Sequence, residues 1–339
     1  MVWCKFTLDN MKLFKSIKYN IDDNNILLKT IKNERTNIKN FFKTNKTYYK
    51  VEKVVEKVND DMIKKDIINL SNEYFVDKLN VLNRLKKLHD TYKISWGNNN
   101  IIIQTTSMEF KSFESRIYIL IGMIEYLRIK THYNKSFSIY LALTNLEKTF
   151  PKNNIIMDVE HANSGYSDMN MNTIYIWRME EFEKVLFHEL MHLFDMDARH
   201  EKYDKHVDID GMDRYYEALT DYYGIYYHII YLSLVSRIKI KLLLELELGF
   251  IRNQANQLND RLNLGNWVGK PNKKIKQKTA SFAYYILKYL LFEYVCNKNE
   301  IIDNIKDYNK LYQELVSKGF IASKFIRIDS ARMTLLQLK

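Results

Sequence analysis

The spacing of hydrophobic residues predicts helices at the start of the chain. Through residues 1–95, hydrophobic positions recur every three or four residues, as at Val51, Val54 and Val58, in a sequence rich in Lys and Asn. This period is typical of amphipathic helices, and few runs in the region resemble strands. We therefore expect a helical N-terminal region over 1–95, ended by the Gly- and Asn-rich break at 96–100.

Beyond the break, short β-branched and aromatic runs alternate with helical periods. Strands are predicted at 101–105, 137–143 and 173–178, and a helix at 113–130. The next helix follows the third strand and should be buried, because its apolar positions form one stripe: Phe182, Val185, Leu186, Leu190 and Leu193. Another long helical run extends from 216 to about 236. The predicted class is α+β, with a core at 96–236 that contains a small mixed sheet and a mostly helical C-terminal subdomain at 237–339.

The buried helix carries a pattern suited to a metal ion. Residues 188–192 read His-Glu-Leu-Met-His. His188 and His192 are four residues apart, so they share one helix face and can both reach one ion at a Zn–N distance of about 2.0–2.1 Å. Glu189 points in another direction, where it can act as general base on a metal-bound water. The segment resembles the HExxH motif of the zincin metallopeptidases, which bind Zn²⁺.

The third metal ligand is predicted by a second motif. The metzincin extension is excluded, because Asp195 and Ala198 stand where that family has glycine and histidine. Glu217 and Asp221 lie four residues apart on the next helix and resemble the ExxxD element of gluzincins, the thermolysin-like zincins. That resemblance implies that Glu217 completes the zinc site and that Asp221 orients a ligand histidine. Asp195 and Asp197 are the alternative third ligands.

The resemblance also implies a donor for the oxyanion of the tetrahedral intermediate. The only histidine after Glu217 is His228, eleven residues further along the same helix. A rise of about 16 Å is too long to reach the metal site, so a tyrosine is expected instead. The candidates are Tyr215, Tyr216, Tyr284, Tyr285 and Tyr289.

Zincins bind the substrate backbone along an edge strand that precedes the strand leading to the metal-binding helix. In this chain the corresponding position falls within 158–167. Gly165 there suits a bulge or a close backbone approach, and Tyr166 follows it. A substrate-binding strand and a plain loop are both compatible with this segment.

Composition narrows the protein class. The chain has 339 residues and only two cysteines, which excludes a disulfide framework and a cysteine zinc cluster. No apolar run near residue 1 has the length of a signal-peptide core. The longest uncharged run, 222–236, falls short of the roughly 18–20 residues that a membrane span requires. We expect a soluble, intracellular protein.

The positive charge of the chain also allows a polyanion as a partner. The formal net charge is +11, and the densest basic run, 270–278, is interpreted as a solvated loop, with contact to a polyanion as the alternative.

These observations favour a zinc-dependent metallopeptidase that hydrolyses peptide bonds in a peptide or protein substrate. Two alternatives are an inactive zincin-fold scaffold and a basic nucleic-acid-binding protein in which the HExxH pattern is incidental. The presence of Glu189 favours the enzyme, because a carboxylate beside an open metal position is useful mainly for catalysis.

Overall fold

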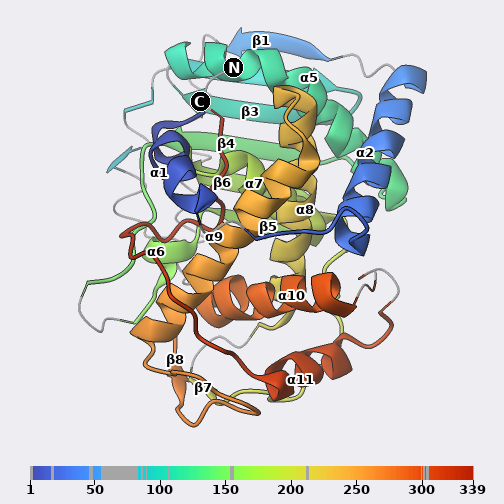
Figure 1. Cartoon of the computed structure of the whole chain (residues 1–339). Helices are drawn as coiled ribbons and strands as arrows, with labels where there is room; N and C mark the ends of the chain where they lie inside the picture. Colours follow the sequence, from blue (N-terminus) through green and yellow to red (C-terminus); the bar gives the residue numbers. More distant parts are fainter. Residues whose placement is uncertain are drawn as a thin grey trace.

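The protein folds as a mixed sheet with helices packed around it (Figure 1). The sheet lies in the upper half of the view in Figure 1, α10 and α11 lie in the lower half, and α9 crosses between them. This mixture of helices and strands confirms the broad expectation of an α+β protein. The computed structural model describes residues 3–16, 19–45, 49–54, 83–84, 87–88, 90–105, 107–152, 156–210, 214–298, 300, 302 and 305–338.

The main sheet has six strands among the described residues, in the order β1-β2-β3-β4-β6-β5. The pairs β3–β4 and β4–β6 are parallel, and the other neighbours are antiparallel. The strand β5 therefore runs against β6 at one end of this order. The strands are β1 (Lys50–Val54), β2 (Asp90–Trp96), β3 (Asn99–Thr105), β4 (Ser138–Thr144), β5 (Gly165–Asp168) and β6 (Thr173–Arg178).

The helices divide by sequence into those that end by residue 193 and those that follow it. The first group comprises α1 (Lys5–Lys15), α2 (Ile26–Thr44), α5 (Ser107–Lys130), α6 (Val159–Ala162) and α7 (Phe182–Leu193). The second comprises α8 (Tyr216–Ser236), α9 (Ile240–Arg261), the π-helix η1 (Phe282–Leu287), α10 (Lys288–Lys298) and α11 (Tyr308–Lys318). A two-stranded parallel pair joins β7 (Ile209–Asp210) to β8 (Ile275–Lys276). Among the described residues, no helix is both long enough and apolar enough to cross a membrane.

Helices α7 and α8 form the buried centre of the molecule. Nearly every residue of α7, and almost all of α8, is buried. Gly224 allows the two helices to approach closely, because a Cβ at this position would lie only 3.3 Å from the Cα of His188. This approach brings the first turns of α8 against the HExxH segment, so the two motifs face each other.

The expectation of an entirely helical region over 1–95 is wrong for two segments. Residues 50–54 and 90–96 form β1 and β2, which pair with each other, and β2 also pairs with β3. The break at 96–100 is the turn of the β2–β3 hairpin, where Gly97 adopts a φ of +53°. These segments form strands because they pair with neighbouring strands. The hydrophobic period within one segment gives no information about such partners. The rest of the apolar period, at 55–82, lies outside the described residues.

The C-terminal region combines the expected helices with a buried extended segment, residues 331–338. Leu338 forms an antiparallel bridge with Trp3, and the backbone N–H of Cys4 donates to the carbonyl of Gln337. At the other end of the segment, the N–H groups of Met333 and Thr334 each lie 2.6 Å from Oε1 of Glu181. Because Glu181 immediately precedes α7, the segment 331–338 supports the start of this helix.

Candidate metal centre

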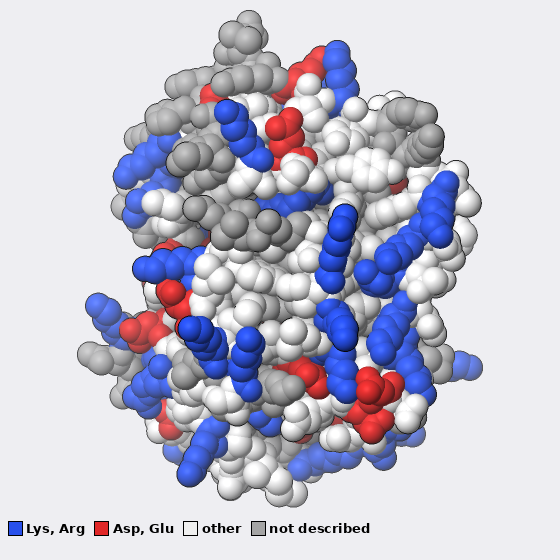
Figure 2. Space-filling model, turned by 45° about the horizontal axis from the view of Figure 1, so that its top comes forward, with Lys and Arg blue, Asp and Glu red and all other residues white. Residues whose placement is uncertain are grey.

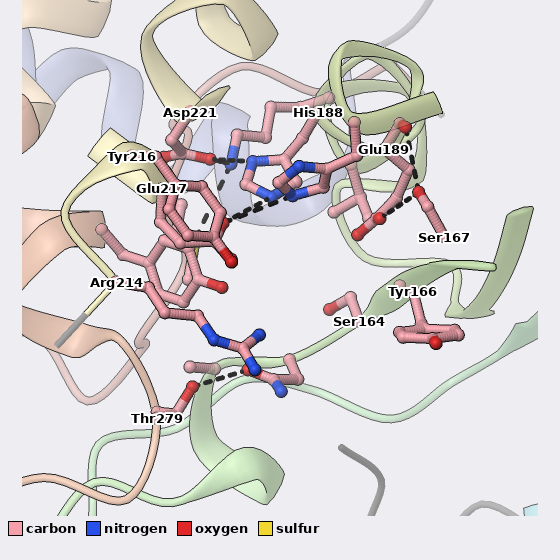
Figure 3. Close-up of a pocket in the computed structure, with 18 of the residues that line it drawn as sticks. Ser164, Tyr166, Ser167, His188, Glu189, Arg214, Tyr216, Glu217, Asp221 and Thr279 are labelled. Carbon is pink, nitrogen blue, oxygen red and sulfur yellow. Dashed lines mark hydrogen bonds and ion pairs between the residues drawn. The ribbon is translucent and has the colours of Figure 1, made fainter. Parts of the chain in front are cut away.

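Three side chains from the two facing helices converge on one point. Nε2 of His188 and Nε2 of His192, both on α7, lie 3.3 Å and 3.4 Å from Oε2 of Glu217 on α8. The candidate ligand atoms of all three residues lie within 4.8 Å of one another. Figure 3 shows the ring of His188 and the carboxylate of Glu217 turned toward each other. The structure thus brings together the three residues that the sequence predicted as ligands.

The spacing of these atoms fits a tetrahedral metal ion. Ligand atoms about 2.0–2.2 Å from a tetrahedral ion lie about 3.3–3.6 Å from one another. The two separations from Glu217 Oε2 match that edge length. This oxygen is also buried and has no hydrogen-bond partner among the described residues. A buried carboxylate oxygen without a donor is costly, and a cation at the point of convergence would satisfy it.

The electrostatics of the site also favour a cation. Burial alone would raise the pKa of Glu217, but the facing imidazoles lower it well below its usual value. Burial would likewise lower the pKa of His192, yet Glu217 and Asp197 raise it to about 10. The carboxylate thus stabilises a positive charge between the three side chains; in these shifts that charge is a proton on the imidazoles, and a metal ion bound to Nε2 would take the place of that proton. Two imidazole nitrogens and one carboxylate oxygen are a donor set that suits Zn²⁺.

Each histidine ring also contacts a carboxylate through Nδ1, on the side of the ring away from Glu217. Nδ1 of His188 lies 3.0 Å from Oδ1 of Asp221, and Nδ1 of His192 is bonded to Oδ2 of Asp197. A ring whose Nδ1–H is held by a carboxylate presents a lone pair on Nε2, which is the form that a metal binds. Asp221 therefore occupies the position that the ExxxD resemblance implied for it, and Asp197 supplies the matching contact for the other histidine.

Asp221 is itself held by two buried lysines. Nζ of Lys288 lies 2.6 Å from Oδ2 of Asp221, and Lys184 forms an ion pair with Oδ1. The two cations keep the pKa of Asp221 well below its usual value, although burial opposes this. Loss of the Asp221 carboxylate would therefore leave both lysines buried without this counter-charge, in addition to freeing the His188 ring.

The remaining alternative ligand, Asp195, lies outside the group. Its side chain is 61% exposed and pairs with the exposed His200 at 3.1 Å. Asp195 lies just after the end of α7, where the chain turns away from the helix with a positive φ of 57° at this residue.

Glu189 lies beside the three candidate ligands, His188, His192 and Glu217, and against the edge strand β5. Oγ of Ser167 on β5 lies 2.6 Å from Oε2 of Glu189 and 2.9 Å from its backbone carbonyl. A Cβ on Gly165 would lie 2.9 Å from Oε1 of Glu189 and 2.8 Å from the Val185 side chain. The close backbone approach expected at Gly165 is therefore confirmed, and residues 165–168 form a strand where a plain loop was the alternative.

A pocket opens onto the three candidate ligands His188, His192 and Glu217. Its wall includes the segment 162–167 with Tyr166, and Arg214, Thr279 and Met333 on other sides. Figure 3 shows Ser164 and Tyr166 on one side of the cavity, and Arg214 and Thr279 on other sides. The pocket therefore joins the edge strand, Glu189 and the three candidate ligands into one site.

Two of the five candidate tyrosines line this pocket. The Tyr284 ring lies 6.0 Å from the His188 ring, and the Tyr216 ring lies 6.1 Å from the His192 ring. Burial raises the pKa of both phenols, so they stay protonated and can donate hydrogen bonds.

The other three candidates are engaged elsewhere. The hydroxyl of Tyr285 donates to the carbonyl of Ala331, Tyr215 accepts from the N–H of Val207, and Tyr289 packs edge-on against Phe320. Their rings therefore belong to the packing around the site.

Comparisons with protein-family models, with curated proteins and with solved structures found no match.

The geometry predicts that substitution of Glu217, Asp197 and Asp195 will weaken metal binding to different extents. Glu217→Ala should weaken zinc binding by about 10²–10³-fold, because it removes a direct ligand. Asp197→Asn should cost about 10–100-fold, since it replaces the charged acceptor that orients His192 by a neutral amide oxygen. Asp195→Ala is the matched control and should leave the affinity unchanged. Competitive titration with a zinc chelator of known affinity measures all three. Metal loss in Asp195→Ala with retention in Glu217→Ala would overturn the ligand assignment.

Proposed function

We propose that the protein is a zinc-dependent metallopeptidase of the gluzincin type, with a zincin-like core around β6, α7 and α8. The observation that carries this proposal is the convergence of His188, His192 and Glu217 on one point, around a buried oxygen that has no other partner among the described residues. Three protein ligands leave a fourth tetrahedral position for water or substrate, which is the arrangement of catalytic zinc sites.

The side chains around the metal group fit the steps of peptide hydrolysis. A zinc ion held there would lower the pKa of a water molecule and polarise the substrate carbonyl. Glu189, fixed by Ser167, would take the proton from the attacking water and pass it to the leaving amine. Tyr284 or Tyr216, whose rings lie beside those of His188 and His192, would donate a hydrogen bond to the oxyanion as it forms.

The edge strand provides a site for the substrate backbone. β5 pairs with β6 on one side and ends the order of described strands on the other. A peptide in an extended conformation can add to such an edge by main-chain hydrogen bonds. Because Gly165 brings β5 directly against Glu189, a peptide bound along β5 would pass the proposed base.

Surface charge gives less support to the nucleic-acid alternative. Figure 2 shows Lys and Arg side chains distributed over one face in small groups, with neutral surface between them. In the basic run, Lys278 pairs with Asp158 at 2.8 Å and Lys270 donates to the carbonyl of Lys205.

Metal removal tests the proposed function directly. The purified protein should hold about one zinc per chain, measured by elemental mass spectrometry, and should cleave a diverse peptide mixture. The chelator 1,10-phenanthroline should abolish cleavage, and stoichiometric zinc should restore it. Hydrolysis that survives complete metal removal would contradict the proposal. A protein that takes up no zinc after reconstitution would favour an incidental HExxH pattern.

A further inference from the structure

Ser164 places a buried hydroxyl in the wall of the pocket, directly before the edge strand β5. The residue is 3% exposed, and its Oγ has no hydrogen-bond partner among the described residues. It lines the same pocket as the three candidate ligands, and Figure 3 shows its side chain pointing into the cavity. A buried hydroxyl without a partner is unfavourable, so a group that enters the cavity and bonds to it would be stabilised.

The backbone around Ser164 is held in place on both sides. Its carbonyl accepts from the N–H of Trp177 at 3.0 Å, which extends the pairing of β5 with β6 by one residue. The carbonyl of Asn163 accepts from Nε of Arg178 at 3.1 Å, and the Asn163 side chain accepts from the Thr279 hydroxyl at 2.9 Å. The Ser164 hydroxyl is therefore presented from a fixed position, and binding to it requires little ordering of the protein.

The position of Ser164 determines which part of a substrate it would meet. Gly165 is next in sequence, and a Cβ there would lie 2.9 Å from Oε1 of Glu189. Because neighbouring Cα atoms are about 3.8 Å apart, a peptide bound along β5 would pass Ser164 within about one residue of the scissile bond. Side chains of a strand stand roughly perpendicular to the sheet. The edge of β5 would thus bind the peptide backbone, and the Ser164 hydroxyl would meet a side chain.

The buried lysines that line the pocket are already paired. Nζ of Lys148 lies 2.8 Å from Oε2 of Glu181, and Lys184 forms an ion pair with Asp221. These lysines therefore have counter-charges within the protein, whereas the Ser164 hydroxyl can both donate and accept a hydrogen bond. The contacts favour a neutral polar group over a charged one beside Ser164.

We infer that Ser164 is a specificity-determining residue, which makes the pocket selective for a neutral hydrogen-bonding side chain, such as Thr or Asn, next to the scissile bond. A substrate hydroxyl or amide would bond to the Ser164 hydroxyl. An apolar side chain of the same shape would leave that hydroxyl buried and unpaired, which a site of this kind disfavours. This inference rests on the proposed peptidase function.

Peptide pairs of matched shape test the subsite. Peptides with blocked ends carry Thr or Val, or Asn or Leu, at the residue before or the residue after the scissile bond, and are otherwise identical. For the zinc-loaded protein, kcat/KM should favour the polar member by about 10–100-fold at one of the two positions. A parent protein that cleaves both members of every pair equally well would overturn the inference.

Ser164→Ala should have opposite effects on the two members of a pair. It should lower kcat/KM for the polar peptide and raise it for the apolar one, because no unpaired hydroxyl then lies against the apolar side chain. A bond to the substrate backbone, or a general structural defect, would lower both alike, and an unchanged ratio would overturn the inference. The matched control is Ser317→Ala, since the exposed Ser317 hydroxyl on α11 donates to the carbonyl of Glu314, within its own helix. This control should keep the parent ratio.

A binding measurement keeps the inference independent of catalysis. Titration calorimetry of the same peptides with Glu189→Gln protein, with and without zinc, should show the same preference, and Ser164→Ala in that background should remove it. Absence of hydrolysis by the parent protein would refute the proposed function alone. Equal affinity for both members of every pair would refute the Ser164 subsite alone.

Discussion

Replacing Glu189 by glutamine is expected to lower the kcat of peptide hydrolysis by about 10²–10⁴-fold, the usual contribution of a general base. The metal and the fold should stay, because Glu189 is not one of the three converging ligands. The glutamine side chain would fill the same space, and its amide oxygen could still accept the hydrogen bond from Ser167 that now reaches Oε2 at 2.6 Å. Steady-state kinetics and zinc content on the same preparation measure both quantities.

Glu160→Gln is the matched control for this substitution. The Glu160 side chain is 53% exposed on α6, near the strand that lines the pocket, and the substitution should leave kcat unchanged. A Glu189→Gln protein as active as the parent would show that another group takes the proton. If the variant lost its zinc instead, Glu189 would have to be placed among the ligands.

Removal of either histidine should eliminate stoichiometric zinc. Each of His188 and His192 contributes one of three protein ligands, and Ala offers no donor in its place. If about 10–16 kcal/mol of binding free energy is shared over the coordination sphere, the loss of one ligand costs on the order of 10²–10³-fold in affinity. Hydrolysis should fall to background with the loss of the metal. The contact with Asp221 is lost in His188→Ala, and the contact with Asp197 is lost in His192→Ala.

A histidine outside the group provides the control for metal loss. His200 is 75% exposed and contacts Asp195, so His200→Ala should keep about one zinc per chain. Elemental analysis after dialysis against trace-metal buffer distinguishes the variants. Full zinc occupancy in both His188→Ala and His192→Ala would exclude the proposed site, whatever the activity of the parent protein.

The proximity of His188, His192 and Glu217 could be predicted from the sequence because both motifs lie within helices. Four-residue spacing on α7 determines how His188 and His192 lie relative to each other, and the same spacing relates Glu217 to Asp221. The buried strand that leads into α7 was also predictable, since β6 is a continuous run of β-branched and aromatic residues.

Features that depend on the path of the chain between elements were not predictable. Asp197 orients His192 only because the turn after α7 directs its carboxylate back to the ring. The contact from Lys288 to Asp221 joins residues far apart in sequence, and no local pattern indicates it. Lys184 did carry a signal, since it precedes His188 by one helical turn and therefore shares the face that meets Asp221. The strands β1 and β2 likewise depend on their partners.

The buried segment 331–338 links the start of α7 to residues that are made late in synthesis of the chain. Met333 and Thr334 donate to Glu181 at the start of α7, and Nζ of Lys288 lies 3.3 Å from the carbonyl of Met333. A ribosome makes both histidines well before it reaches these residues. The contacts with Glu181 therefore form only after residues 333 and 334 have been synthesised, and α7 gains this support late in synthesis.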